Sequence, residues 1–139
     1  MNQTQNIALD SCVVIDIMEK PKIASGLKAR LRGKSVKIIL CDIVLDEVKR
    51  VRGYSSEKII TKLSNLLGRK IELSQSDEDS ISNANQITNQ FQICHNGDNK
   101  ILSLCQAKDF VLVTFDKMLL RASQFIGVAA FHPSMVGGI

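Results

Sequence analysis

The chain has 139 residues and a formal net charge of +4; 45% of its residues are hydrophobic, only 4% are aromatic, and none is Trp. This length and apolar content predict a single domain with a proper core and exclude a disordered protein. The apolar segment from Ile7 to Met18 is interrupted by Asp10 and Asp16, so we expect neither a signal peptide nor a membrane span.

Short apolar runs alternate with amphipathic segments along the chain. We expect strands at 6–10, 36–41, 70–73, 110–114 and 128–131. We expect helices at 12–19, 43–52, 55–67, 78–91, 98–108 and 117–125, and a basic helix that starts after Pro21 and ends near Arg32. This alternation predicts an α/β fold, a three-layer α/β/α sandwich with a mostly parallel central sheet. We expect the domain to cover residues 1–132 and residues 133–139 to form a loose tail.

Four carboxylates stand at or near the ends of expected strands: Asp10, Glu47, Asp98 and Asp116. Ligands of an open parallel sheet bind outside the carboxyl ends of its strands. Acids placed there would converge on one crevice although they are far apart in the sequence. A cluster of oxygen ligands suits a hard divalent cation, Mg²⁺ or Mn²⁺.

Helix capping is the competing explanation for three of these acids. Asp10, Asp98 and Asp116 each precede or open an expected helix, and Asp is a good N-cap residue. Taken singly, capping explains each of them better than metal binding does. Glu47 lies inside its helix and cannot be explained in this way, so the four acids together favour the metal site.

The helical pattern separates Glu47 and Asp98 from ordinary surface acids. Glu47 neighbours Val44 and Val48 at the edge of an apolar face, whereas Asp46 falls on the solvent side. Asp98 begins a stripe whose positions 101, 102 and 105 are apolar. A carboxylate on a core-facing stripe is costly unless it is paired, hydrogen-bonded or metal-bound.

Basic residues are concentrated in the first half of the chain. Residues 20–37 contain seven Lys and Arg residues and no acid. Such a segment beside a carboxylate cluster suits a polyanion that is held near a metal ion. The candidates for phosphate contacts are Lys20, Lys22, Lys28, Arg30 and Arg32. The alternative is a basic surface that only keeps the protein soluble.

The four cysteines form neither a CxxC pair nor a zinc-binding spacing with the two histidines. Cys12, Cys41 and Cys105 fall in apolar runs, and we interpret them as buried, reduced thiols. Reduced thiols favour a cytoplasmic protein.

From Ile7 to about Phe131 the chain resembles the PIN-domain nucleases. Four motifs carry the resemblance: an Asp after the first strand in residues 9–15 (LDSCVVI), a Glu early in a helix in residues 44–48 (VLDEV), an Asp that opens a helix in residues 97–102 (GDNKIL), and Thr-x-Asp in residues 114–119 (TFDKML). Two positions depart from the family pattern. Cys12 replaces a residue that is usually Ser, Thr or Asn, and Phe115 replaces a residue that is often Asn, Asp or Gly.

The resemblance implies an Mg²⁺- or Mn²⁺-dependent endoribonuclease with Asp10, Glu47, Asp98 and Asp116 as catalytic and metal-binding residues. Ser11 and Thr114 would support them, Thr114 by orienting Asp116. Asp10 and Asp98 would bind the metal directly and the others through water. The expected partners are RNA, a second copy of the chain and, if this is a toxin of the VapC type, an antitoxin protein.

Three other interpretations stay open. The chain could be an RNA-processing nuclease rather than a toxin, or a non-catalytic RNA-binding or scaffold member of the same family. A phosphoacceptor receiver domain has a similar length and fold class. It would usually carry paired acids after the first strand, where this chain has Ser11-Cys12 after Asp10.

Overall fold

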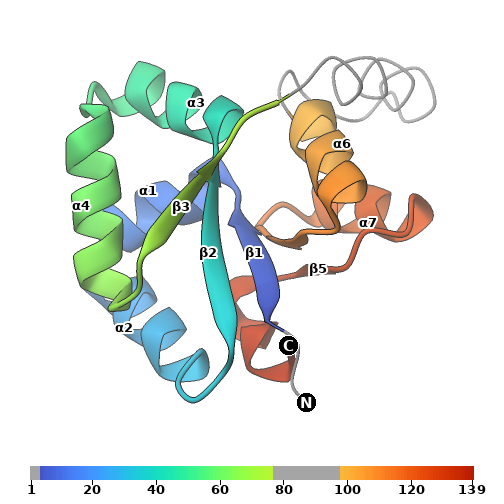
Figure 1. The fold of residues 1–139 in the computed structure, drawn as a ribbon, viewed down its shortest axis with the longest axis horizontal. Coiled ribbons are helices and arrows are strands. Elements are labelled where there is room, and N and C mark those ends of the chain that lie inside the picture. Colours follow the sequence, from blue (N-terminus) through green and yellow to red (C-terminus); the bar gives the residue numbers. More distant parts are fainter. Residues whose placement is uncertain (1–3, 77–97) are drawn as a thin grey trace.

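The computed structural model describes residues 4–76 and 98–139, with the side chain of Asp98 outside the described part. The strands of these residues form one parallel sheet in the order β3-β2-β1-β4-β5 (Figure 1). They are β1 (Gln5–Leu9), β2 (Val36–Cys41), β3 (Ile71–Ser74), β4 (Val111–Val113) and β5 (Ala130–Phe131). The expected parallel sheet is confirmed, and each described strand overlaps its predicted range.

Helices cover both faces of this sheet. They are α1 (Ser11–Glu19), α2 (Pro21–Arg30), α3 (Asp42–Arg52), α4 (Ser56–Leu67), α6 (Asp98–Lys108) and α7 (Lys117–Phe125). Figure 1 shows α1, α2 and α4 together on one side of the sheet and α6 and α7 on the other. The three-layer α/β/α architecture is therefore confirmed. In the part of the chain that the structure describes, none of these helices is long and apolar enough to cross a membrane.

Local sequence signals explain most helix boundaries. Pro21 is the first residue of α2, where its missing N–H and fixed φ cost little. Gly53 and Gly68 end α3 and α4 with φ angles of 71° and 64°, a left-handed conformation that glycine adopts readily. The basic helix stops at Arg30 rather than Arg32 because Leu31 already caps it. The helix expected at 78–91 lies outside the described residues.

The core is built from aliphatic side chains, as the low aromatic content requires. Ile38 and Leu40 of β2 have no exposed surface, and all three residues of β4 are buried. Both faces of these strands are therefore covered, which is typical of parallel sheets. In α6 the buried segment runs from Ile101 to Cys105 and includes Ser103, a polar residue outside the apolar stripe at positions 101, 102 and 105.

The segment after His132 is not loose, contrary to the expectation from its Pro and Gly residues. Residues Pro133–Gly138 form a 3₁₀ helix that His132 caps through its ring nitrogen Nδ1. Val136 is buried, and Lys34 Nζ donates a hydrogen bond of 2.9 Å to the carbonyl oxygen of Ile139. The buried side chains of Pro133 and Val136 and this long-range hydrogen bond help to hold the short segment against α2 and β5.

The strand order reverses between β1 and β4, which defines a position at the carboxyl edge of the sheet. The chain proceeds from β1 to β2 to β3 in one direction and then returns to β4 and β5 on the other side of β1. In open α/β sheets, the point where the order reverses opens a crevice for ligands. The residues that directly follow β1 and β4 therefore flank this crevice.

Candidate active site at the carboxyl edge of the sheet

Asp10 is the residue that leaves β1 and starts α1. Its backbone N–H donates to the carbonyl oxygen of Val113 (3.0 Å), so its peptide still belongs to the sheet. Its carboxylate accepts a hydrogen bond from the Ser11 N–H at Oδ1 (2.8 Å) and caps the helix. Only 6% of Asp10 is exposed. The fold thus places a buried carboxylate at the point where the strand order reverses.

Thr114, which follows β4, holds the second oxygen of this carboxylate. Its hydroxyl donates to Asp10 Oδ2 (2.7 Å) and accepts a hydrogen bond from the Asp116 N–H (3.1 Å). Thr114 is completely buried. The expected side-chain hydrogen bond between Thr114 and Asp116 is present, and it is made at the backbone N–H of Asp116. The same hydroxyl also connects the ends of β1 and β4 through Asp10.

The carboxylate of Asp116 caps α7. Its Oδ1 accepts hydrogen bonds from the N–H groups of Met118 (2.8 Å) and Leu119 (3.3 Å). Both bonds end on the same oxygen, and Asp116 is half-buried. Capping therefore accounts for one carboxylate oxygen, which is why this acid does not need Thr114 to fix it.

Cys12 takes the place of the usual hydroxyl or amide residue beside Asp10. Its Sγ donates to Asp10 Oδ2 over 3.5 Å and lies 3.9 Å from Thr114 Oγ1. Burial, and then the charge of Asp10, raise the pKa of the Cys12 thiol to about 11. The thiol therefore keeps its proton at neutral pH and serves as a weak donor to the carboxylate.

Phe115, the second departure from the family pattern, contacts the C-terminal segment. Its ring packs edge-on against His132, with 5.2 Å between the ring centroids. This departure from the family pattern therefore contributes to holding the C-terminal 3₁₀ helix.

Glu47 and Asp46 on α3 are placed as their helical positions predict. Glu47 is half-buried and Asp46 is exposed. The neighbouring Asp42 is fixed at the end of β2 by hydrogen bonds. It accepts bonds from the Ser76 hydroxyl (2.8 Å) and the Ser76 N–H (3.1 Å). Its position directly after a strand, like that of Asp10, is the signal that would have marked it.

Asp98 begins α6, and the structure describes its backbone only. The face that it begins is confirmed as core, since Ile101, Leu102 and Cys105 are each at most 1% exposed. Burial, and then the charges of Cys41 and Asp10, raise the pKa of the Cys105 thiol. The buried face of α6 therefore approaches the end of β1, where Asp10 lies.

The chemistry of Asp10 suits a cation, although the described residues do not complete a metal site. In residues 4–76 and 98–139 no salt bridge reaches Asp10, so hydrogen bonds alone offset its buried charge. No three described Asp, Glu, His or Cys side chains come close enough together to hold one ion. Hydrogen bonds connect Asp10, Ser11, Thr114 and Asp116, and Glu47 lies half-buried on α3.

The basic residues are not gathered beside this crevice. Lys28 and Arg32 lie with Gly68 and Arg69 just before the amino ends of β2 and β3, at the opposite edge of the sheet. The expectation that the whole basic run borders the carboxylates is therefore wrong, because α1 and α2 carry the chain down the length of the sheet.

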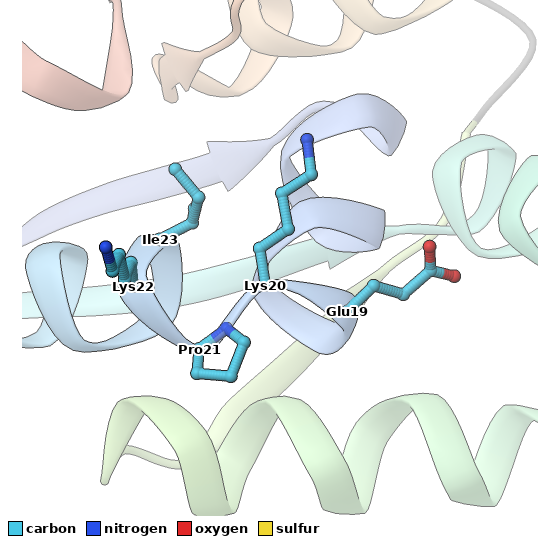
Figure 2. Close-up of a pocket in the computed structure, with 5 residues that line it drawn as sticks. All are labelled: Glu19, Lys20, Pro21, Lys22 and Ile23. Atoms are coloured by element: carbon cyan, nitrogen blue, oxygen red, sulfur yellow. The ribbon is translucent and has the colours of Figure 1, made fainter.

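Lys20 and Lys22 lie nearer the middle, at the junction of α1 and α2. They line an open hollow with Glu19, Pro21 and Ile23 (Figure 2). Lys20 runs back along α1, and its Nζ lies 3.4 Å from Asp16 Oδ2. Lys22 points away from Lys20 in the same view. The two cations therefore do not form one phosphate site.

Comparison with known proteins decides the family. The model of the PIN domain matches residues 7–124. The chain belongs to the PIN domain family. PIN domains are generally nucleases that use divalent metal ions, and the matched range contains Asp10, Glu47, Asp98 and Asp116. A search of curated proteins found no match.

Solved structures with this PIN fold include proteins from three bacteria. The crystal structure of VapBC2 from Rickettsia felis bound to a promoter DNA fragment contains a chain with 18% identity and a TM-score of 0.69, covering 92% of this chain and 98% of that chain. VapBC-1 from nontypeable Haemophilus influenzae gives 17% identity, a TM-score of 0.69 and coverages of 94% and 99%. DNA-bound VapBC from Salmonella typhimurium gives 18% identity and a TM-score of 0.64, and the match covers 93% of this chain and 98% of that chain. At such identities the likeness establishes the fold.

Proposed function

We propose that this PIN domain is a divalent-metal-dependent endoribonuclease, with the crevice between β1 and β4 as its active site. The observation that supports the proposal most is the buried carboxylate of Asp10, which Ser11 and Thr114 hold in one orientation where the strand order reverses. A fixed carboxylate without a cationic side-chain partner among the described residues is suited to a metal ion. Family membership supports the same chemistry.

Each residue has a distinct role in this proposal. Asp10 and Asp98 would hold Mg²⁺ or Mn²⁺ directly, and Glu47 and Asp116 would act through water, since Mg²⁺ keeps several of its waters. A metal ion held by these residues would supply a water of lowered pKa and positive charge for the scissile phosphate. The Ser11 amide and the Thr114 hydroxyl keep the two oxygens of Asp10 in place.

We also propose that the chain is the toxin of a toxin–antitoxin pair and acts in the cytoplasm. The VapBC chains from Rickettsia felis, Haemophilus influenzae and Salmonella typhimurium are covered over 98% or more of their length, so the domain has their size as well as their fold. An antitoxin and a second copy of the chain are the proposed protein partners. A role in RNA processing is the alternative within the same chemistry.

A second candidate is a PIN domain that binds RNA without cleaving it. One observation favours it: no three metal-binding side chains of the described residues approach one another. Metal-dependent cleavage separates the two candidates, because a binding protein would retain RNA without turning it over.

The test compares two neighbouring acids on α3. With Mn²⁺ present, the native protein is expected to cleave a labelled single-stranded RNA, and excess EDTA should stop the reaction. Glu47→Gln should reduce the cleavage rate on the order of 10–100-fold, as expected for a group that acts on the metal through water. Asp46→Asn removes the same charge from an exposed position one residue away and should leave the rate unchanged.

Rates are to be measured on gel-resolved products over a range of Mn²⁺ concentrations. If the protein binds RNA but does not cleave it at any Mn²⁺ or Mg²⁺ concentration, the nuclease proposal is wrong and the RNA-binding candidate is favoured. If the cleavage rate falls equally in Glu47→Gln and Asp46→Asn, the total charge of α3 matters rather than the position of Glu47.

Thr114 offers a test of how Asp10 is held. Thr114→Val keeps the shape of the side chain but removes the hydroxyl that donates to Asp10 Oδ2 and accepts from the Asp116 N–H. Leaving these buried groups unpaired should cost about 1–3 kcal/mol of unfolding free energy. We also expect a 10–100-fold higher Mn²⁺ concentration for half-maximal cleavage, as for other residues that orient a metal ligand.

Thr114→Ser is the matched variant, since it retains the hydroxyl. It should restore the Mn²⁺ requirement of the native protein even if the lost methyl group lowers stability. A positioning role is wrong if Val and Ser variants need the same Mn²⁺ concentration, because a purely structural role would change stability without changing metal affinity.

A further inference from the structure

A second pocket lies at the amino edge of the sheet, away from the carboxylates. It has a volume of about 360 Å³, and its lining residues are Lys28, Arg32, Gly33, Leu67, Gly68 and Arg69. They come from the end of α2 and the loop after it, and from the end of α4 and the loop before β3. Three of the six are cations and none is an acid, so the pocket is positively charged.

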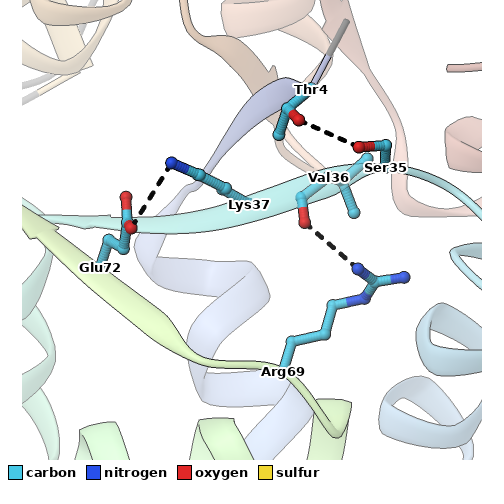
Figure 3. A network of polar contacts seen from close by, with 6 residues as sticks. All are labelled: Thr4, Ser35, Val36, Lys37, Arg69 and Glu72. Carbon is cyan, nitrogen blue, oxygen red and sulfur yellow. Dashed lines mark hydrogen bonds and ion pairs between the residues drawn. The ribbon is translucent and has the colours of Figure 1, made fainter. Parts of the chain in front are cut away.

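Arg69 is fixed in this pocket by neutral groups. Its Nη1 donates to the carbonyl oxygen of Val36 (3.2 Å), and its Nη2 donates to those of Leu31 (2.7 Å) and Lys34 (3.2 Å). Figure 3 shows the guanidinium turned towards Val36. Carbonyl groups orient the guanidinium without neutralising it, and a guanidinium has more donors than these bonds use. Arg69 therefore presents a pre-oriented, half-buried positive charge.

The side chain of Lys28 reaches the pocket by passing over Gly68. Gly68 has a φ of 64°, and a Cβ atom there would lie 3.3 Å from Lys28 Cε and 3.6 Å from Lys28 Nζ. The side chain of Lys28 therefore lies over Gly68, which any larger residue would crowd. Arg32 also lines the pocket, one residue before Gly33, and is exposed.

No acid of the described chain forms an ion pair with these cations. The ion pairs of residues 4–76 and 98–139 join Lys20 with Asp16, Lys37 with Glu72 and Arg52 with Glu19. Glu72, which follows this pocket in the sequence, is 3.8 Å from Lys37 (Figure 3). Three like charges around one pocket repel one another, and an anion between them would relieve this repulsion.

We propose that this pocket binds a backbone phosphate of RNA, at a site separate from the carboxylates. The planar fork of Arg69 and the point charge of Lys28 both suit phosphate oxygens. β2 has six residues, so roughly 20 Å of strand separate the two edges of the sheet. An RNA that occupies both sites must therefore extend along the protein surface from one edge of the sheet to the other. That the polyanion is RNA rests on the proposed function.

The first experiment tests the pocket with inorganic phosphate alone. Among the described residues, four glycines have positive φ angles; Gly33 and Gly68 line the pocket, and Gly53 and Gly127 lie outside it. Titration of ¹⁵N-labelled protein with phosphate should shift the amide resonances of Gly33 and Gly68 and leave those of Gly53 and Gly127 in place. The Lys28→Ala/Arg32→Ala variant should lose these shifts. Equal shifts at all four glycines, or none, would contradict the pocket.

The second experiment tests RNA, with binding measured by fluorescence anisotropy in EDTA over a series of salt concentrations. Each phosphate contact contributes a slope of about 0.7 in log K against log salt for a single strand. Lys28→Ala/Arg32→Ala should reduce the slope by about this amount. Lys22 and Arg30, the candidates from the sequence that lie outside the pocket, occupy exposed positions on α2, so Lys22→Ala/Arg30→Ala removes one Lys and one Arg and should leave the slope unchanged.

The outcomes separate this proposal from the nuclease. If both double variants reduce the slope equally, the basic run acts as a general charged surface and the pocket is contradicted. If phosphate shifts Gly33 and Gly68 but the RNA slope does not change, the assignment to RNA is overturned in favour of a small phosphate-bearing ligand. If RNA binds through the pocket but is never cleaved with Mn²⁺, the pocket stands and the nuclease proposal fails.

Discussion

Replacing Asp10 by Asn is expected to reduce metal-dependent RNA cleavage to below about one hundredth of the native rate while the protein stays folded. Asn keeps an oxygen that can accept from the Ser11 N–H and cap α1. Its amide can donate to Thr114, whose hydroxyl can turn to accept it. What is lost is the negative charge that would hold the metal. Because that charge is buried without a salt bridge among the described residues, thermal unfolding should occur at the same or a higher temperature.

The control is Asp16→Asn, on the same helix. Asp16 is half-buried and contacts Lys20 at the surface, so this variant removes one carboxylate of α1 that does not face the crevice. It should cleave like the native protein. Cleavage by Asp10→Asn at the native rate, with circular dichroism showing a folded protein, would rule out the crevice between β1 and β4 as the active site.

The elements of the fold could be predicted because their signals are local. Apolar runs, Pro21, Gly53 and Gly68 mark where segments start and end, and the structure uses them as expected. The observed ends of an element differ from the predicted ends where packing sets them. The strand expected at 128–131, for example, pairs with β4 only at Ala130 and Phe131. Likewise the burial of Ser103 depends on what α6 packs against, which no periodicity within the helix reveals.

The role of Thr114 shows why the site was only partly predictable. Thr114 is two residues from Asp116 in the sequence, so a local hydrogen bond between them was the natural hypothesis, and the structure contains one at the Asp116 N–H. The other partner of the Thr114 hydroxyl, Asp10, is 104 residues away and was not predicted. The two meet because Leu9 pairs with Val113 in the sheet. Strand register is set by packing across the whole domain, and the residue types alone do not contain it.

The basic residues illustrate the opposite error. Lys28 and Arg32 follow the helix that starts at Asp10, and closeness in sequence suggested closeness in space. The two helices α1 and α2 together carry the chain from the carboxyl edge of the sheet to the amino edge before β2 begins. A charge run therefore identified candidate phosphate-binding residues but not the face on which they lie.

Asp98→Asn gives the sharpest test of the proposed role of Asp98 in the metal site, since the side chain of this residue lies outside the described part of the structure. Asp98 opens α6, and the buried residues Ile101, Leu102 and Cys105 confirm the core-facing stripe that it begins. Asn supports a helix start almost as well as Asp does, so capping should survive the substitution. If Asp98 holds the metal beside Asp10, cleavage should fall by about 100-fold or more, and unfolding should not become easier because repulsion between neighbouring acids is relieved.

The matched variant for Asp98 is Asp109→Asn, at the other end of α6. Asp109 is exposed and has a φ of 57°, a conformation that Asn tolerates well, so the variant removes a charge without straining the backbone. It should cleave RNA normally. Metal binding is to be followed separately, as the Mn²⁺ concentration at half-maximal cleavage and by calorimetric titration of Mn²⁺ without RNA. Native cleavage and native Mn²⁺ affinity in Asp98→Asn would leave helix capping as the whole explanation of this acid and restrict the metal site to Asp10 and its immediate neighbours.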